Sequence, residues 1–208
     1  MSIQPNETSV TTLPPVADPG PLGLAAFALT TFLVSAFNAH WTRGTTAFLP
    51  FALGYGGLVQ LLAGMWEFKR NNIFAATAFG TYGGFWIGVF FYFELVAPHA
   101  TTAAMLDNDL GWIFLAFAIF NTYMLLWSTQ VNVAVFGVFL TLEVTEIFLF
   151  IGNFSSNSST VKIGGVIGIV TAVVAWYASA AGVINGMRGV PVLPVGKPFG
   201  MKPAARAD

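Results

Sequence analysis

Long apolar runs alternate with short polar breaks along most of this 208-residue chain. An α-helix needs about 20 consecutive apolar residues to cross a lipid bilayer. Six runs reach or approach that length, and polar breaks separate them. The widest break covers residues 97–110, where we expect residues 98–109 to form the longest ordered loop. The pattern predicts membrane-spanning helices at residues 21–41, 47–67, 73–96, 111–129, 132–153 and 163–187.

The two ends of the chain have a polar composition rich in proline. Residues 1–17 are expected to form an extended or disordered cytoplasmic tail, and residues 188–208 a second cytoplasmic tail. Residues 18–187 would then hold the six-helix membrane domain. The predicted fold class is an all-α, multi-pass protein of the cell membrane (inner or plasma membrane).

The charged residues decide the orientation. Basic residues favour the cytoplasmic side of a membrane protein. With the N-terminus inside, two basic residues, Arg43 and Lys162, lie outside. Both termini are therefore predicted to be cytoplasmic, together with the six remaining basic residues, Lys69, Arg70, Arg188, Lys197, Lys202 and Arg206.

Composition narrows the function classes. Only 8% of the residues are charged, against about 25% in soluble domains, which agrees with a membrane protein. The net charge of −1 argues against a nucleic-acid partner, and the absence of cysteine excludes disulfides and thiol chemistry. No catalytic, cofactor or metal-binding motif is present, so we expect a protein that is not an enzyme and carries no cofactor and no metal.

Polar residues recur at helical spacing on four of the expected spans. Residues three or four apart share one helix face. These stripes have two interpretations: hydrogen bonds between helices, or the lining of a pathway through the membrane. Several aligned stripes favour the pathway. The residues are Phe27, Thr31, Ser35 and Asn38; Gly56, Gln60, Gly64 and Glu67; Thr77, Thr81 and Tyr82; and Leu142, Glu146, Leu149 and Asn153.

Two carboxylates, Glu143 and Glu146, fall within the fifth expected span. A charge near the bilayer centre costs several kcal/mol on insertion scales. Both residues are candidates for binding a proton that moves with a substrate. The structural alternative is a carboxyl group that is hydrogen-bonded between helices.

Glycines recur every four residues in two spans. Such rows let helix backbones approach closely in lipid. Close helix packing is therefore predicted at Gly80, Gly84 and Gly88, and at Gly164 and Gly168.

A short motif precedes and opens the first span. Its acidic first residue can cap the helix, because a carboxylate accepts from the unpaired N–H groups of the first turn, and prolines fit at such a start. The motif resembles the Asn-Pro-Ala-Pro-Leu-Gly-Leu signature of the acetate uptake transporter family, also called the GPR1/FUN34/YaaH family. Residues 55–69, 77–86, 151–153 and 192–196 resemble later family segments in the same order. The motif residues are Asp18, Pro19, Gly20, Pro21, Leu22, Gly23 and Leu24.

The resemblance implies six helices around a pathway in each protomer, and assembly as a homo-hexamer in the lipid bilayer. It also implies uptake of acetate and sometimes succinate, by proton-coupled symport or through an anion channel. The family's narrow apolar constriction corresponds by position to Phe27, Tyr82 and Leu142. Asp18 stands where the signature has Asn, which adds a negative charge near the mouth of the pathway.

The sequence therefore predicts a permease for acetate and related short-chain carboxylates, with protons as a possible second substrate. The alternatives are a channel for another small solute, such as ammonium or a different anion, and a membrane sensor or assembly protein that transports nothing. The predicted pathway residues are Thr30, Thr31, Asn38, Gln60, Trp86 and Asn153.

Overall fold

The computed structural model describes residues 16–43 and 47–200. The prediction for residues 1–15, and those for Lys202 and Arg206, lie outside the described residues. Within the described ranges all regular structure is helical.

Six helical stretches are long and apolar enough to cross a membrane. The second contains a π-helical segment, η1, and the third ends in a π-helical turn, η2, followed by a short 3₁₀ turn, η3. The prediction of an all-helical protein with six membrane spans is confirmed. The elements are α1 (Gly20–Asn38); α2 (Leu49–Phe51), η1 (Ala52–Val59) and α3 (Gln60–Lys69), which are continuous; α4 (Ile73–Phe91), η2 (Tyr92–Val96) and η3 (Ala97–His99); α5 (Ala103–Ser128); α6 (Val133–Phe154); and α7 (Ser158–Arg188).

The fourth and sixth spans begin earlier than hydropathy predicts. Thr102 caps α5 by accepting a hydrogen bond from the Met105 amide at 3.2 Å. Asn157 caps α7 by accepting from the Thr160 amide at 3.1 Å. The expected loop at residues 98–109 is therefore wrong, since most of it is the first turns of α5. Hydropathy detects only the apolar part of a helix, whereas the cap fixes where the helix starts.

The start of α1 differs from the prediction by one residue. The helix begins at Gly20, so Pro19 rather than Asp18 occupies the capping position. Asp18 still accepts a hydrogen bond from the Gly20 amide, at 2.9 Å. Pro21 is in the first helical turn, where a missing N–H group costs nothing.

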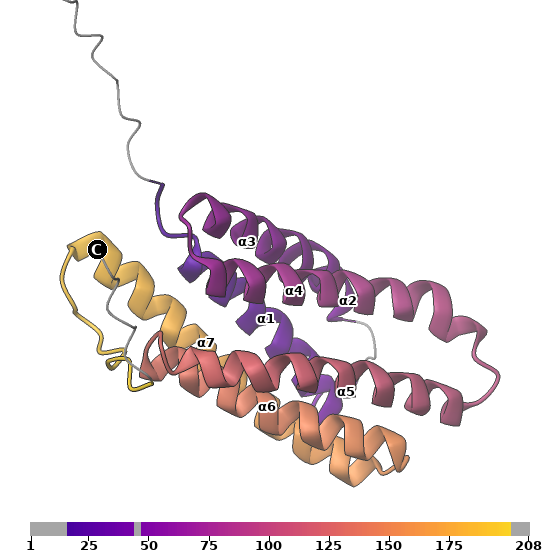
Figure 1. Ribbon diagram of the computed structural model, residues 1–208. Coiled ribbons are helices and arrows are strands. Elements are labelled where there is room, and N and C mark those ends of the chain that lie inside the picture. The colour runs from indigo at the N-terminus through magenta and orange to yellow at the C-terminus, as the bar shows by residue number, and fades with distance from the viewer. Residues whose placement is uncertain (1–15, 44–46, 201–208) are drawn as a thin grey trace, which may run out of the picture.

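The six spans pack in a ring, with α1 between the α3–α4 pair and the α6–α7 pair (Figure 1). Helix α7 is the main neighbour of both α1 and α6, and α5 packs on α6. The seam between α4 and α5 is the loosest one, and aromatic rings fill it: Phe85 and Phe117 have centroids 4.5 Å apart. The start of α1 lies beside the later half of α7, where the Ser179 hydroxyl donates to the Pro21 carbonyl at 2.6 Å.

Glycines allow the tightest helix contacts. A Cβ atom added at Gly165 would lie 2.4 Å from the Ala39 amide nitrogen, and one at Gly168 would lie 2.2 Å from the Ser35 hydroxyl oxygen. One at Gly164 would lie 3.1 Å from the Leu149 side chain. The predicted close packing at Gly164 and Gly168 is confirmed.

Within one chain, the glycine row of α4 is in close helix contact only at Gly80, whose amide nitrogen would lie 2.7 Å from a Cβ atom added at Gly64 of α3. A Cβ atom at Gly84 or Gly88 would meet no described atom within 4 Å, and one at Gly80 would meet only the Met65 side chain, at 3.8 Å. Helix α3 also approaches a neighbouring face of α4. There a Cβ atom at Gly83 would lie 2.8 Å from the Leu61 amide nitrogen.

The chain after α7 turns back onto the bundle. The Asn185 side chain holds residues 192 and 193 through three hydrogen bonds to their backbone. The Ala134 amide then donates to the Val195 carbonyl at 2.9 Å. The described part of the expected tail, up to residue 200, is thus packed against the ends of α6 and α7.

Candidate functional site

Two cavities penetrate the helix ring from its opposite ends. Cavity 1 has a volume of about 260 Å³, and cavity 2 a volume of about 410 Å³. Both are lined mainly by apolar side chains. Three residues line both cavities, and they are the three that the sequence predicts to form a constriction: Phe27, Tyr82 and Leu142.

These three side chains come from α1, α4 and α6. All are buried, with exposed fractions of 5%, 4% and 7%. The rings of Phe27 and Tyr82 pack edge to face, with centroids 5.7 Å apart. Phe120 of α5 also packs edge to face with Tyr82, with ring centroids 5.4 Å apart. The two cavities therefore meet at a closed apolar layer that is one set of side chains thick.

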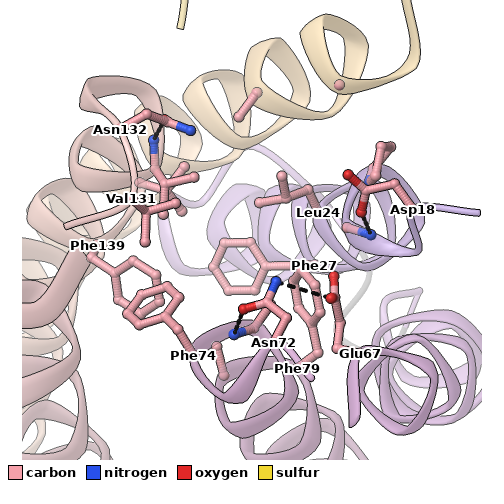
Figure 2. A pocket seen from close by; sticks show the side chains of 18 of the residues that line it. Asp18, Leu24, Phe27, Glu67, Asn72, Phe74, Phe79, Val131, Asn132 and Phe139 are labelled. Carbon is pink, nitrogen blue, oxygen red and sulfur yellow. Dashed lines mark hydrogen bonds between the residues drawn. The ribbon is translucent and has the colours of Figure 1, made fainter. Parts of the chain in front are cut away.

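Cavity 1 carries its charged groups at one side, close to the start of α1. Figure 2 shows the carboxyl groups of Asp18 and Glu67 on that side, with the rings of Phe74 and Phe139 packed together across the cavity at 5.4 Å. Arg70, in the turn after α3, binds the Asp18 carboxylate at 2.5 Å and lies 3.6 Å from that of Glu67.

The neutral residue Asn72 also belongs to this cluster, which contains Asp18, Glu67 and Arg70. Its side chain donates to Glu67 at 2.9 Å and accepts from the Ala75 amide at the start of α4, at 3.3 Å. The cluster ties Asp18, just before α1, to the turn that joins α3 and α4.

Cavity 2 contains most of the predicted polar lining. The stripes of α1 and α6 both face it, with Ser35 and Leu149 among their members. Its far end is polar and includes His40, Asp107 and Asn157. Four predicted pathway residues line this cavity: Thr31, Asn38, Trp86 and Asn153.

Two other predicted pathway residues are placed differently. Gln60 is almost fully buried and lines cavity 1. Thr30 lines neither cavity. Its hydroxyl donates to the carbonyls of Ala26 at 3.1 Å and Phe51 at 3.4 Å, the second at the junction between α2 and η1. Thr30 therefore serves the contact between α1 and the second span.

The two intramembrane carboxylates have different surroundings. Glu146 is 4% exposed and lines cavity 2, and the Tyr82 hydroxyl lies 3.3 Å from its Oε1. Glu143 lines neither cavity. Its two oxygens accept from the side chains of Asn121 at 2.7 Å and Thr122 at 2.8 Å, both on α5. The interhelical alternative thus describes Glu143, whereas Glu146 faces the cavity.

Asn121 was not predicted. It is fully buried, donates to Glu143 and to the Phe139 carbonyl, and lies 3.1 Å from the Tyr82 hydroxyl. It connects Tyr82 of the apolar layer to Glu143, while the same Tyr82 hydroxyl lies near Glu146. The available signal was a lone amide in the middle of an apolar run, which is rarely accidental at membrane depth.

A family model described as the GPR1/FUN34/yaaH family matches residues 2–197. The chain belongs to this family. The match covers all six spans, so the resemblance carried by the motif at residues 18–24 extends to the whole membrane domain.

Relatives within the GPR1/FUN34/yaaH family carry names of transport proteins. Acetate permease A of Emericella nidulans is 38% identical over 92% of this chain and 69% of its own length. The succinate-acetate/proton symporter SatP of Escherichia coli K12 is 31% identical over 88% of this chain and 96% of its own. Ammonia transport outward protein 2 of Saccharomyces cerevisiae is 38% identical over 80% of this chain. The chain spans 61% of the length of that yeast protein.

A solved structure shares the fold. The structure of the bacterial acetate channel SatP matches with a TM-score of 0.82 and 30% identity, over 88% of this chain and all of the other. Together with the six apolar spans, these similarities identify a multi-pass membrane protein with the fold of a family of permeases and channels.

Proposed function

We propose that this protein is a membrane permease for acetate and related short-chain carboxylates, with succinate as a further candidate, and that each chain carries its own pathway. One observation supports this most: two cavities enter from opposite ends of the ring and share only Phe27, Tyr82 and Leu142. The names of the acetate permease and of both SatP proteins supply the substrate class.

The apolar layer would select substrates by size and by their affinity for water. An ion loses hydration at an apolar constriction, and such constrictions gate by dewetting. A short carboxylate has a small apolar end that fits such a layer. Polar side chains lie on both sides of the layer: Gln60 in cavity 1, and Thr31, Trp86 and Glu146 in cavity 2. Among the described residues no Lys or Arg lines either cavity, so substrate would be held by neutral donors or together with a proton.

Uptake of labelled acetate into proteoliposomes tests the proposal. Purified protein should raise uptake above that of protein-free liposomes. Unlabelled propionate and succinate should compete, and methylammonium should not. Competition by methylammonium alone would favour the ammonium alternative, which the yeast relative's name raises. No flux of either solute would favour a sensor or assembly protein.

A matched pair of variants tests the position of the pathway. Phe27→Ala removes one wall of the shared layer and should change the acetate rate or admit larger acids. Phe91→Ala on α4 is the control, because Phe91 is exposed and lines neither cavity. Equal behaviour of the two variants would overturn the assigned pathway.

The predicted homo-hexamer remains part of the proposal. Light scattering of the detergent-solubilised protein, corrected for bound detergent, should give six times the chain mass of 22.2 kDa. A monomer that still transports acetate would leave the pathway intact and contradict only the assembly.

A further inference from the structure

Three buried polar atoms in cavity 2 have no hydrogen-bond partner within the described protein. They are Thr31 Oγ1, Trp86 Nε1 and Glu146 Oε2. Their residues are only 4%, 3% and 4% exposed, and come from α1, α4 and α6. Buried polar groups are nearly always hydrogen-bonded, because leaving one unsatisfied costs about 1–3 kcal/mol. Three such atoms lining one cavity require polar partners inside it, which a polar ligand or water can supply.

Thr31 differs from five other threonines of the spans in what its hydroxyl contacts. A threonine in a helix commonly donates its hydroxyl to the carbonyl four residues earlier. Its neighbour Thr30 does so, and Thr31 does not. The same back-bond occurs at Thr122, Thr141, Thr145 and Thr171. The Thr31 hydroxyl is therefore free to donate into the cavity.

Trp86 and Glu146 complete the set. An indole nitrogen is only a donor, and when buried it usually has an acceptor. Glu146 has one oxygen near the Tyr82 hydroxyl and a second oxygen without a partner. The set thus offers two neutral donors, from Thr31 and Trp86, and one carboxyl oxygen, from Glu146. The two donors match the two oxygens of a ligand carboxyl group, and a proton can lie between one of those oxygens and Glu146.

The surrounding charges favour a ligand that arrives with a proton. The titratable groups around Glu146 are Tyr82 on α4, Glu143 beyond Asn121, and His40, Tyr92 and Asp107, which also line the cavity. No described Lys or Arg lines the cavity to balance a second anion. Two carboxylates in contact at such a site share one proton rather than both staying ionised.

We propose that Thr31, Trp86 and Glu146 form a binding subsite for the carboxyl group of a short carboxylic acid, which is held together with one proton shared with Glu146. The subsite rests on the proposed function. It adds that the transported species is the carboxylic acid with its proton and not the bare carboxylate anion. It also assigns proton coupling to Glu146, while Glu143 supports Asn121 from the side away from the cavity.

The first test measures equilibrium binding of acetate to the purified protein by calorimetry. Loss of one donor should raise the Kd about tenfold in Thr31→Val and in Trp86→Phe. Thr30→Val is the matched control, since its hydroxyl serves the backbone of the first two spans. Trp66→Phe is the second control, because Trp66 is 54% exposed and lines neither cavity. Both controls should keep Kd within about twofold of the wild type, even where Thr30→Val lowers stability.

The second test varies pH. Because binding takes up one proton, the wild-type Kd for total acetate should rise by up to about tenfold per pH unit toward alkaline pH. In Glu146→Gln the Kd should become nearly independent of pH, and a pH gradient should no longer drive uptake into proteoliposomes. Glu143→Gln should retain the wild-type pH dependence. Acetamide, which has the shape of acetic acid but no acidic proton, should bind the wild type without the acetate pH dependence.

The outcomes separate the subsite from the function. If wild-type protein transports acetate but Thr31→Val and Trp86→Phe match their controls, the subsite is wrong and the permease proposal stands. If Glu146→Gln and wild type share one pH dependence, the shared proton is wrong. If wild-type protein transports no acetate, the proposed function itself fails.

Discussion

The Tyr82 hydroxyl lies 3.3 Å from Glu146 Oε1 and 3.1 Å from Asn121 Oδ1. The same residue, through its ring, closes the layer at which the two cavities meet. Tyr82 therefore joins the apolar layer physically to the buried polar cluster. A change of protonation or ligand at Glu146 would act directly on a side chain that separates the two cavities.

Tyr82→Phe separates these two roles, because it keeps the ring and removes the hydroxyl. The variant should lose about 1 kcal/mol of stability, since Glu146 Oε1 and Asn121 lose a partner. Its size selectivity among carboxylates should stay that of the wild type. Thermal unfolding in detergent and uptake competition measure the two effects. Tyr123→Phe, at an exposed tyrosine of α5, is the control and should change neither.

Leu142→Ala should widen the layer without touching the polar cluster. Removing a buried leucine side chain costs about 2–5 kcal/mol, less where a site collapses. The two cavities would then join, so uptake of butyrate and benzoate should rise relative to acetate. Leu140→Ala on the same helix, where Leu140 is exposed, should leave the ratio unchanged. An unchanged ratio in Leu142→Ala would place the selective step elsewhere.

Gly165→Ala should disrupt the contact between α1 and α7. The added methyl group would lie 2.4 Å from the Ala39 amide nitrogen, and backbone atoms have little freedom to move away. We expect a loss of about 3 kcal/mol or failure to assemble. Gly186→Ala on the same helix meets no described atom within 4 Å and should be neutral or slightly stabilising. Unfolding midpoints of the two variants give the comparison.

Asp18→Asn restores the residue of the family signature. The amide oxygen can still accept from the Gly20 amide, and the lost ion pair with Arg70 is partly exposed, so stability should change by less than about 1 kcal/mol. One negative charge leaves the lining of cavity 1. The concentration for half-maximal acetate uptake should fall about twofold at low salt, and the difference should vanish at high salt. Asp109→Asn, which alters neither cavity lining, is the control.

Hydropathy was sufficient to predict the number of spans, because the length of an apolar helix must match the thickness of the bilayer. Hydropathy was insufficient to predict where each helix begins and ends. Thr102 and Asn157 start α5 and α7 inside polar segments through local side-chain caps. A cap contributes nothing to mean hydropathy, so both starts were expected too late.

Helical periodicity predicted faces but not neighbours. It put Thr31 and Asn38 on one face of α1 and Asn153 on one face of α6, and all three residues line cavity 2. It left Glu143 off the α6 stripe but did not name its partner, which is Asn121 on α5, whereas Glu146 faces the cavity. Gly84 and Gly88 of α4 are open within one chain for the same reason, since the position of α3 decides which face of α4 it contacts. The shared position of Phe27, Tyr82 and Leu142 was expected from family resemblance alone, because no local pattern marks a meeting point of three helices.

The thinness of the layer between the cavities has an electrical consequence. With solution in both cavities, the membrane voltage falls mainly across that single set of side chains rather than over the roughly 30 Å of hydrocarbon. An acetate anion crossing there would gain or lose about 2.3 kcal/mol per 100 mV, whereas acetic acid carrying its proton would feel none of it. Currents recorded across a planar bilayer at symmetric acetate would therefore report which species passes: a voltage-driven current for the anion, and electrically silent flux for the acid.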